Sequence, residues 1–178
     1  MITDTDTQLL SDGTVTLRAL EPADIDTVLE WENDTRMWTS ATTAAPFSRR
    51  NIEEYVLTYD ADIFSARQLR LMICVDGVAV GAADLFDFDP VNRRAGIGVV
   101  VGEPFRRRGY AARALALLAR YCRDRIGMHQ LWAIVRADNA SSRSMLVAAG
   151  YDTCGRLRSW LRHGTTYTDA YLYQLLLP

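Results

Sequence analysis

Hydrophobic and polar positions along the chain alternate between a two-residue period, typical of β-strands, and the 3.6-residue period of amphipathic helices. Strands are predicted at 15–20, 71–75, 78–86, 95–101 and 130–135, with a final pair that turns around Arg162-His163-Gly164 and ends in the apolar run 171–177. Helices are predicted at 22–31, 49–59 and 111–125, with a short one that ends near 149. This order predicts an α/β (α+β) fold with a mixed, mostly antiparallel central sheet and flanking helices.

Turn and cap residues agree with these boundaries. Asp76-Gly77 separates two strand-like runs by two residues, which predicts a β-hairpin with a type I′ turn. Pro22 stands at a favourable position for a helix start, and Ser48 can cap the helix that follows it. We see no internal repeat, linker or low-complexity tract, so we expect one domain over 15–178 behind an N-terminal tail over 1–14.

Composition and charge narrow the class of protein. With 178 residues and 49% hydrophobic content, the chain can bury a core without disulfides or metals. A net charge of -2 and a pI near 5.7 argue against a nucleic-acid-binding protein, which needs a basic face. Residues 1–12 are polar and acidic, unlike a signal peptide, and no apolar run approaches the roughly 20 residues of a membrane span. We therefore expect a cytoplasmic protein that binds neither nucleic acid nor membranes.

The cysteines and histidines predict no metal site. Cys74, Cys122 and Cys154 are widely separated and lie among apolar residues, so we expect buried, reduced thiols. His129 begins a predicted strand, and His163 lies in a predicted turn. No spacing of His, Cys and Asp matches a metal site, and the sequence contains no Gly-x-Ser-x-Gly nucleophile motif.

The four tryptophans are expected in the core or as walls of a cleft, since aromatic side chains are mostly buried. They are Trp31, Trp38, Trp132 and Trp160. Trp38 and Phe47 fall in the loop between the first two predicted helices, which we expect to frame a substrate cleft.

The strongest indication of chemistry is the segment Arg106-Arg107-Arg108-Gly109-Tyr110-Ala111, between the apolar run 97–101 and the helix predicted at 111–125. A helix start presents unpaired N–H groups and the positive end of the helix dipole, and a glycine lets an anion approach the backbone. The segment therefore predicts a site for a diphosphate. It is neither a Walker A loop, because the sequence contains no lysine, nor a GxGxxG dinucleotide motif.

The motif Arg-x-x-Gly-x-Ala after a strand resembles the acyl-CoA signature of the GNAT N-acyltransferases. Downstream, the strand at 130–135, the segment Asn139-Ala140-Ser141-Ser142-Arg143, a short helix and Gly150-Tyr151 resemble the second motif of that family. The resemblance covers about Val15 to Leu177. It looks closest to the branch that holds bacterial spermidine N-acetyltransferases and Rim-type ribosomal-protein N-terminal acetyltransferases, and it implies the acyl-CoA N-acyltransferase fold.

The resemblance implies acetyl-CoA as the cosubstrate, with no metal. The pantetheine arm would bond to the main chain of a strand, and the pyrophosphate to N–H groups at the helix start, with arginine side chains within reach of the 3′-phosphate. The residues implied are Val99, Val100 and Val101 for the strand, Arg106, Arg107, Arg108, Gly109, Tyr110, Ala111 and Ala112 for the pyrophosphate segment, and Asn139, Ser142 and Arg143 in the second motif.

The resemblance also implies candidates for proton transfer. Asp84 and Asp87 match carboxylates of the spermidine enzymes and are candidates to take the amine proton. Many family members carry a Glu base in the next strand, where this chain has Gly96. The spermidine enzymes carry a Tyr acid where this chain has Leu146, whereas Rim-type enzymes carry a Ser that matches Ser142, our candidate to stabilise the departing thiolate. The alternatives are a solvated strand end for the aspartates and a backbone-bonded first-turn residue for the serine.

We expect acetyl transfer from acetyl-CoA to a primary amine by direct attack, the acceptor being a small-molecule amine or a protein N-terminus. A polyamine is the alternative acceptor. The spermidine enzymes carry Glu-Glu-Pro-Tyr where this chain has Ala44-Ala45-Pro46-Phe47, followed by Arg49 and Arg50, which disfavours a polycation. A CoA-binding regulatory module without turnover is the alternative of a different class. We also expect a dimer or larger homo-oligomer, formed through the apolar strand 171–177.

Overall fold

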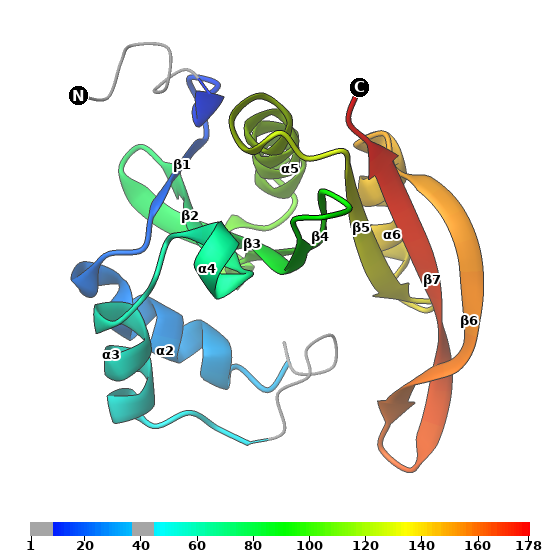
Figure 1. The fold of residues 1–178 in the computed structure, drawn as a ribbon. Helices are drawn as coiled ribbons and strands as arrows, with labels where there is room; N and C mark the ends of the chain where they lie inside the picture. Colours follow the sequence, from blue (N-terminus) through cyan, green and yellow to red (C-terminus); the bar gives the residue numbers. More distant parts are fainter. Residues whose placement is uncertain (1–8, 37–44) are drawn as a thin grey trace.

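The computed structural model describes residues 9–36 and 45–178, which form one sheet of seven strands with helices on both faces (Figure 1). The strand order is β1-β2-β3-β4-β5-β7-β6. The strands are β1 (Thr16–Ala19), β2 (Leu69–Val75), β3 (Val78–Asp89), β4 (Arg94–Val101), β5 (Gln130–Arg136), β6 (Asp152–His163) and β7 (Thr166–Leu176). All neighbours are antiparallel except β4 and β5, which are parallel. The predicted mixed, mostly antiparallel sheet is therefore confirmed.

The longer helices lie on opposite faces of the sheet. Helices α5 (Tyr110–Tyr121) and α6 (Ala140–Ala148) cover one face, and α2 (Ile25–Asn33) and α3 (Arg49–Leu57) cover the other (Figure 1). Shorter helical pieces are η1 (Pro22–Asp24), α4 (Ile63–Ala66), η2 (Glu103–Phe105) and η3 (Cys122–Ile126). Among the described helices, none combines the length and apolar character needed to cross a bilayer.

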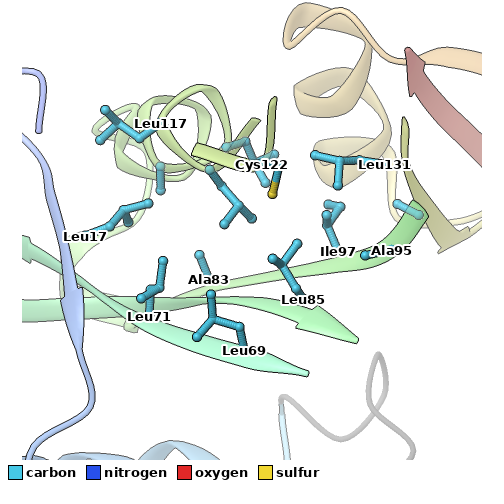
Figure 2. Packing of buried hydrophobic residues seen from close by; sticks show 14 of the residues in the cluster. Leu17, Leu69, Leu71, Ala83, Leu85, Ala95, Ile97, Leu117, Cys122 and Leu131 are labelled. Carbon is cyan, nitrogen blue, oxygen red and sulfur yellow. The ribbon is translucent and has the colours of Figure 1, made fainter. Parts of the chain in front are cut away.

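Figure 2 shows the apolar cluster that fills the space between α5 and the sheet. Leu71, Leu85 and Ile97 contribute from three adjacent strands, and Leu115 and Leu118 contribute from α5, all of them buried. A second cluster lies on the other face, where buried residues of α2 and α3 meet those of β2 and β3. The sheet is thus covered with apolar side chains on both faces, which explains why its central strands are apolar almost throughout.

Helix ends differ from the predictions for local reasons. The helix predicted at 111–125 ends as an α-helix at Tyr121, and a π-helical turn follows until Gly127, whose φ of 72° stops it. The helix predicted to reach Tyr59 ends at Leu57. Helix α4 was not predicted, because four residues are too few to show a helical period. It begins where the Asp62 carboxylate accepts a hydrogen bond from the Phe64 N–H at 3.0 Å.

The predicted β-hairpin is confirmed between β2 and β3. Asp76 and Gly77 have φ values of 49° and 78°, and a type I′ turn needs positive φ at both residues. β3 continues beyond the predicted end at Phe86 to Asp89, across a break in the pairing with β4. Asp87 stands inside this break with a φ of 50°, so it protrudes from a β-bulge.

Two predictions of burial were wrong, both on β6. Cys74 and Cys122 are buried thiols as expected, but Cys154 is exposed. Trp160 is also exposed, with 55% of its surface accessible, so it lies in neither core nor cleft. β6 is an edge strand, and its register against β7 shifts at two places: between Thr153 and Gly155, where Cys154 lies, and between Leu157 and Leu161, where Trp160 lies. Trp38 lies outside the described residues.

The two ends of the described chain are tied to the domain. Part of the predicted tail packs on α5, because Arg120 donates from Nη2 to the carbonyls of Leu9 (3.0 Å) and Ser11 (3.1 Å). At the other end, β7 lies between β5 and β6 and is paired along both edges. Both edges of β7 are therefore paired within the chain over 170–174, so a second copy could pack against this strand but could not pair with it edge to edge there.

Candidate acetyl-CoA site

The sheet opens between its two parallel strands. β4 pairs with β5 only at three positions, the last joining Gly96 to Trp132, although β4 continues to Val101. Beyond Gly96, the edge of β4 that faces β5 carries no strand, while its other edge stays bonded to β3 as far as Val101. Such an edge offers main-chain N–H and C=O groups to an extended ligand.

The turn before α5 shapes its backbone for an anion. Arg107 and Gly109 have φ values of 62° and 79°, and α5 begins at the next residue, Tyr110. The N–H groups of the first helical turn have no partner within the helix, and the helix dipole adds positive potential there. This end of α5 therefore provides a place for a phosphate group.

A cavity of about 510 Å³ connects the open edge of β4, the start of α5 and the start of α6. Ten residues predicted from the sequence line it: Val99, Val101, Arg106, Arg107, Gly109, Tyr110, Ala111, Ala112, Asn139 and Ser142. Segments separated by about forty positions in the sequence thus meet in one place. The cavity is large enough for part of a cofactor of CoA size.

Three predicted residues lie outside this cavity. Val100 points to the opposite face of the sheet and packs against the second apolar cluster. Arg108 donates from Nη2 to the carbonyl of Pro104 at 3.2 Å. Arg143 donates to the Tyr173 hydroxyl (3.1 Å) and to the Ala137 carbonyl (3.0 Å), and its guanidinium stacks on a neighbouring tyrosine ring. The strand period explains Val100, whereas the arginines are held by contacts that the sequence does not reveal.

Four lining residues were not predicted. They are Arg36, Phe105, Ser141 and Met145. Arg36 follows α2, far from the other lining residues in sequence, and it is ion-paired with Asp34 (2.8 Å) and Glu103. No local motif marks it, so only the fold brings it to the cavity. Ser141 and Met145 share the first turns of α6 with the predicted Ser142.

The start of α6 combines a structural role with a place in the cavity. The Asn139 side chain caps the helix, because its Oδ1 accepts a hydrogen bond from the Ser142 N–H at 3.1 Å. Both residues also line the cavity. Leu146, which stands where the spermidine enzymes carry a tyrosine, is buried in the core at 2% exposure. A residue at this position therefore faces the core in this structure, and Met145 faces the cavity instead.

Asp84 lies on the face opposite α5, in a row of residues across three strands. Arg70 of β2 pairs with Asp84 of β3, which pairs with Gly98 of β4. Arg70 donates from Nε to Oδ1 of Asp84 (2.7 Å), from Nη2 to Oδ2 (3.1 Å), and from Nη1 to Glu32 of α2 (2.7 Å). The carboxylate of Asp84 is thus held in a bidentate ion pair, and two carboxylates share one guanidinium.

The pKa values of Arg70 and of the neighbouring Tyr55 are both raised. Burial acts to lower the pKa of Arg70, but the carboxylates and Tyr55 more than offset it, so the pKa is raised and the guanidinium stays charged. Burial also raises the pKa of the Tyr55 hydroxyl to about 12. Near neutral pH, neither group changes charge.

The next row of the sheet carries two aromatic rings and includes Gly96, the position where many family members carry a Glu base. Phe86 of β3, Gly96 of β4 and Trp132 of β5 are successive neighbours, and the two rings meet edge to face with centroids 5.3 Å apart. Asp87, on the bulge, is exposed and lines a groove of about 520 Å³ together with Trp132, Ile134 and Leu172. The two candidate aspartates are therefore in different settings, one ion-paired and one solvated.

Within residues 9–36 and 45–178, no three His, Cys, Asp or Glu side chains gather in a way that would hold a metal ion. The residues that line the cavity bring main-chain N–H groups, serines and arginines to it. These groups bind anions and move protons, as acyl transfer requires.

Known proteins resemble this chain over most of its length. The family model described as Acetyltransferase (GNAT) domain matches residues 14–152. A putative ribosomal N-acetyltransferase of Bacillus subtilis, YdaF, is 25% identical over 170 residues, which cover 91% of each chain. Spermidine N(1)-acetyltransferase of Escherichia coli is 25% identical over 99 residues, 56% of this chain and 53% of that protein, so the chain spans only about half the length of the first curated relatives it matches.

The fold also has solved counterparts. RimL, a ribosomal L7/L12 α-N-protein acetyltransferase solved with coenzyme A, superimposes with a TM-score of 0.84 at 18% identity, covering 94% of this chain and 96% of that one. At this identity the likeness shows the fold alone. Together with the match of the family model to residues 14–152, it establishes the resemblance expected from the motifs: the chain belongs to the GNAT acetyltransferase family.

Proposed function

We propose that the protein is an N-acetyltransferase that moves the acetyl group of acetyl-CoA to a primary amine. The observation that carries this proposal is the cavity that joins the open edge of β4 to the starts of α5 and α6. In acetyl-CoA, the extended pantetheine arm would use the open edge of β4, the diphosphate the start of α5, and the thioester the region near the start of α6. Membership of the GNAT family supports the same reaction class.

Acetyl-CoA would bind with its pantetheine arm along Val99–Val101 and its pyrophosphate on the N–H groups of Arg107 to Ala112. A Cβ at Gly109 would meet no protein atom within 4 Å, so the space above this residue is open to a ligand. Arg107, exposed beside the cavity, supplies a forked donor for a phosphate. CoA is the only cofactor that we propose.

The reaction would proceed by direct attack. The amine nitrogen forms a bond to the thioester carbonyl carbon, the carbon–sulfur bond breaks, and the amine loses a proton. The products are an amide and the thiol of CoA, which takes up a proton in place of the acetyl group. Ser142, which lines the cavity, would stabilise the departing thiolate, and Asp84 or Asp87 would accept the amine proton directly or through water.

The acceptor is proposed to be a small-molecule amine or a protein N-terminus. The named activities of relatives point in both directions, to spermidine and to ribosomal proteins. The charge argument against a polyamine is weaker than the sequence indicated, because Arg49 is ion-paired with Asp26 and Glu53. Arg50 remains as a cation beside this pair on an exposed helix face.

Thiol release tests the proposal. Wild-type protein with acetyl-CoA and a panel of primary amines is expected to release CoA thiol only when an amine is present, with one acetyl group gained by the amine for each thiol. A CoA-binding module would bind acetyl-CoA in calorimetry and release no thiol with any amine. We propose, in addition, that the protein acts in the cytoplasm as a dimer or larger homo-oligomer.

A further inference from the structure

On the face of the sheet opposite α5, two positions of β4 next to its open edge carry no side chain. Gly96 and Gly98 both point to this face, as alternate residues of a strand do. Gly96 is buried under the Phe86 ring, but Gly98 is half-exposed. Because β5 has already separated from β4 at this point, nothing in β5 pairs beside Gly98.

The missing side chain of Gly98 leaves room for one small group. A Cβ placed there would lie 3.7 Å from Cβ of Asp84, 3.8 Å from its Oδ2, and 4.0 Å from Cε1 of Phe86. These are ordinary contact distances, so an atom of methyl or ammonium size fits over Gly98. One wall of the space is a carboxylate, and the other is the edge of an aromatic ring.

The charges around this space favour a cation. Asp84 and Glu32 are both ion-paired with Arg70, so these three side chains together carry one net negative charge. Each oxygen of the Asp84 carboxylate retains acceptor capacity beyond its bond to Arg70. One ammonium group near Oδ2 of Asp84 would balance that charge.

Beyond Gly98 the surface becomes aromatic and then apolar. Phe86 and Trp132 are half-exposed and in edge-to-face contact. They lead to the groove of about 520 Å³, where Trp132, Ile134 and Leu172 form apolar walls. Asp89 and Arg94 in this groove pair with each other at 3.3 Å, so the groove holds one unpaired carboxylate among the residues described, that of Asp87.

We propose that the acceptor lies along this surface, with its ammonium group over Gly98 and an apolar or aromatic body along Phe86 and Trp132 into the groove. This inference rests on the proposed function and names the class of its acceptor: a primary amine with an apolar or aromatic body. Gly98 is then the residue that determines specificity, because any side chain there occupies the place of the amine. The amine would reach the thioester from the face opposite the one that Val99 and Val101 line.

The test compares three probe amines with matched variants. For the wild type, kcat/KM for 4-phenylbutylamine should exceed that for n-butylamine and for spermidine by at least about tenfold, as expected for filling an apolar pocket. Gly98→Ala should lower kcat/KM for 4-phenylbutylamine by more than about tenfold and leave the Kd of acetyl-CoA unchanged, since displacing a reacting atom by roughly 1 Å costs about a hundredfold.

Gly155→Ala is the matched control, because a Cβ there also meets no forbidden contact and the residue lies on the distant β6. Equal melting temperatures of the two variants would show that both fold. The acceptor site is refuted if wild type acetylates the amines and Gly98→Ala keeps its full kcat/KM. A preference for spermidine or n-butylamine would overturn the acceptor class. No thiol release with any amine would reject the proposed function itself, and this inference with it.

Discussion

The ring of Phe86 covers the backbone of Gly96 on the neighbouring strand. A Cβ built on Gly96 would lie 2.3 Å from Cε2 of Phe86 and 2.6 Å from its Cζ, far inside any allowed contact. Many GNAT enzymes carry a glutamate base where this chain has Gly96. A side chain at that position would therefore have to displace the ring, and in this chain the proton must leave the amine by a route that does not use residue 96.

Gly96→Ala is expected to destabilise the fold by about 1–3 kcal/mol, because the new methyl group must displace a packed ring. Removing the ring with Phe86→Ala in the same chain should recover part of this loss. Urea unfolding of the two single variants and the double variant gives the coupling energy. Gly98→Ala serves as a control and should cost little, since its Cβ meets only ordinary contacts. Additive effects of the two changes would contradict the packing described here.

Gly109→Val is expected to weaken CoA binding by more than about 1 kcal/mol, because the anion loses N–H donors when the backbone leaves its positive φ. The cost arises from the backbone angle of 79°, since the space above Gly109 is open. Gly77→Val is the matched control, with a φ of 78° in a distant hairpin. Both variants should lose stability, but calorimetry should find weaker CoA binding only for Gly109→Val. If Gly109→Val bound CoA as tightly as Gly77→Val does, the turn before α5 would not be part of the CoA site.

The catalytic roles separate by their kinetic signatures. Ser142→Ala should lower kcat with nearly unchanged acetyl-CoA affinity, because its hydroxyl would act on the departing thiolate. Asp87→Asn should lower kcat at neutral pH, with a smaller loss at high pH where the free amine is abundant; proton-transfer groups contribute roughly 10²- to 10⁴-fold.

Asp84→Asn is a less specific probe of the same step, because it also removes the charge and one of the two oxygens that bind Arg70, and leaves that cation with one carboxylate. Its melting temperature must therefore be compared with that of Asp87→Asn. Full activity of all three variants on the true acceptor would show that these residues are misassigned while leaving the reaction class intact.

Acid should destabilise the fold partly through Asp24. Its carboxylate accepts two hydrogen bonds from Arg18, both 2.7 Å, and one from the Glu21 N–H at 2.9 Å. The Arg18 bond, opposed by burial and helped by Glu21, lowers the pKa of Asp24. A lowered folded-state pKa contributes stability above the unfolded value of about 3.9, and this stability is lost as pH falls through the folded-state pKa.

Asp24→Asn should therefore cost about 1–3 kcal/mol near pH 7, between the values for surface and buried pairs because Arg18 is 35% exposed. The difference from wild type should shrink below about pH 4, where protonation removes the same charge from the wild type. Chemical unfolding over a pH series measures both trends. Asp76→Asn, in an exposed turn that accepts asparagine, is the control and should show neither.

Self-association should involve the long hairpin of β6 and β7. The hairpin extends past the end of β5 (Figure 1), and Trp160 and Tyr167 on it are 55% and 64% exposed. Large exposed aromatic residues are typical of interaction surfaces. Light scattering at micromolar concentration should find a dimer or larger species in wild type and a smaller one after Trp160→Lys. A monomeric wild type would end the oligomer proposal.

The parts of the fold that follow from local rules were predictable. The turn at Asp76-Gly77 and the amphipathic periods of the helices needed only neighbouring residues. Among the ten predicted cavity residues, those within 106–112 follow from a glycine and a helix start after a strand, whereas Val99, Val101, Asn139 and Ser142 were implied by the resemblance to the GNAT family. Arg143 shows the limit: its type fits CoA, but a tyrosine hydroxyl thirty residues away holds it elsewhere.

What depends on pairing between strands could not be predicted. The ion pair of Asp84 with Arg70, and the ring of Phe86 over Gly96, arise from cross-strand register. Register joins residues far apart in sequence, and no local pattern records it. Both relationships affect which residue can accept the amine proton, so the candidate base is where sequence and structure differ most.

The separation of β4 from β5 has a mechanical consequence. Three residue pairs connect the half of the sheet that contains β1 to β4 with the half that contains β5 to β7. A cofactor arm lying along Val99–Val101 would act as an eighth, non-peptide strand and brace the two halves. The sheet would then become more rigid as the cofactor site fills. The folded chain would also become more stable, because a ligand that binds only the folded chain adds its binding free energy to the stability of that chain.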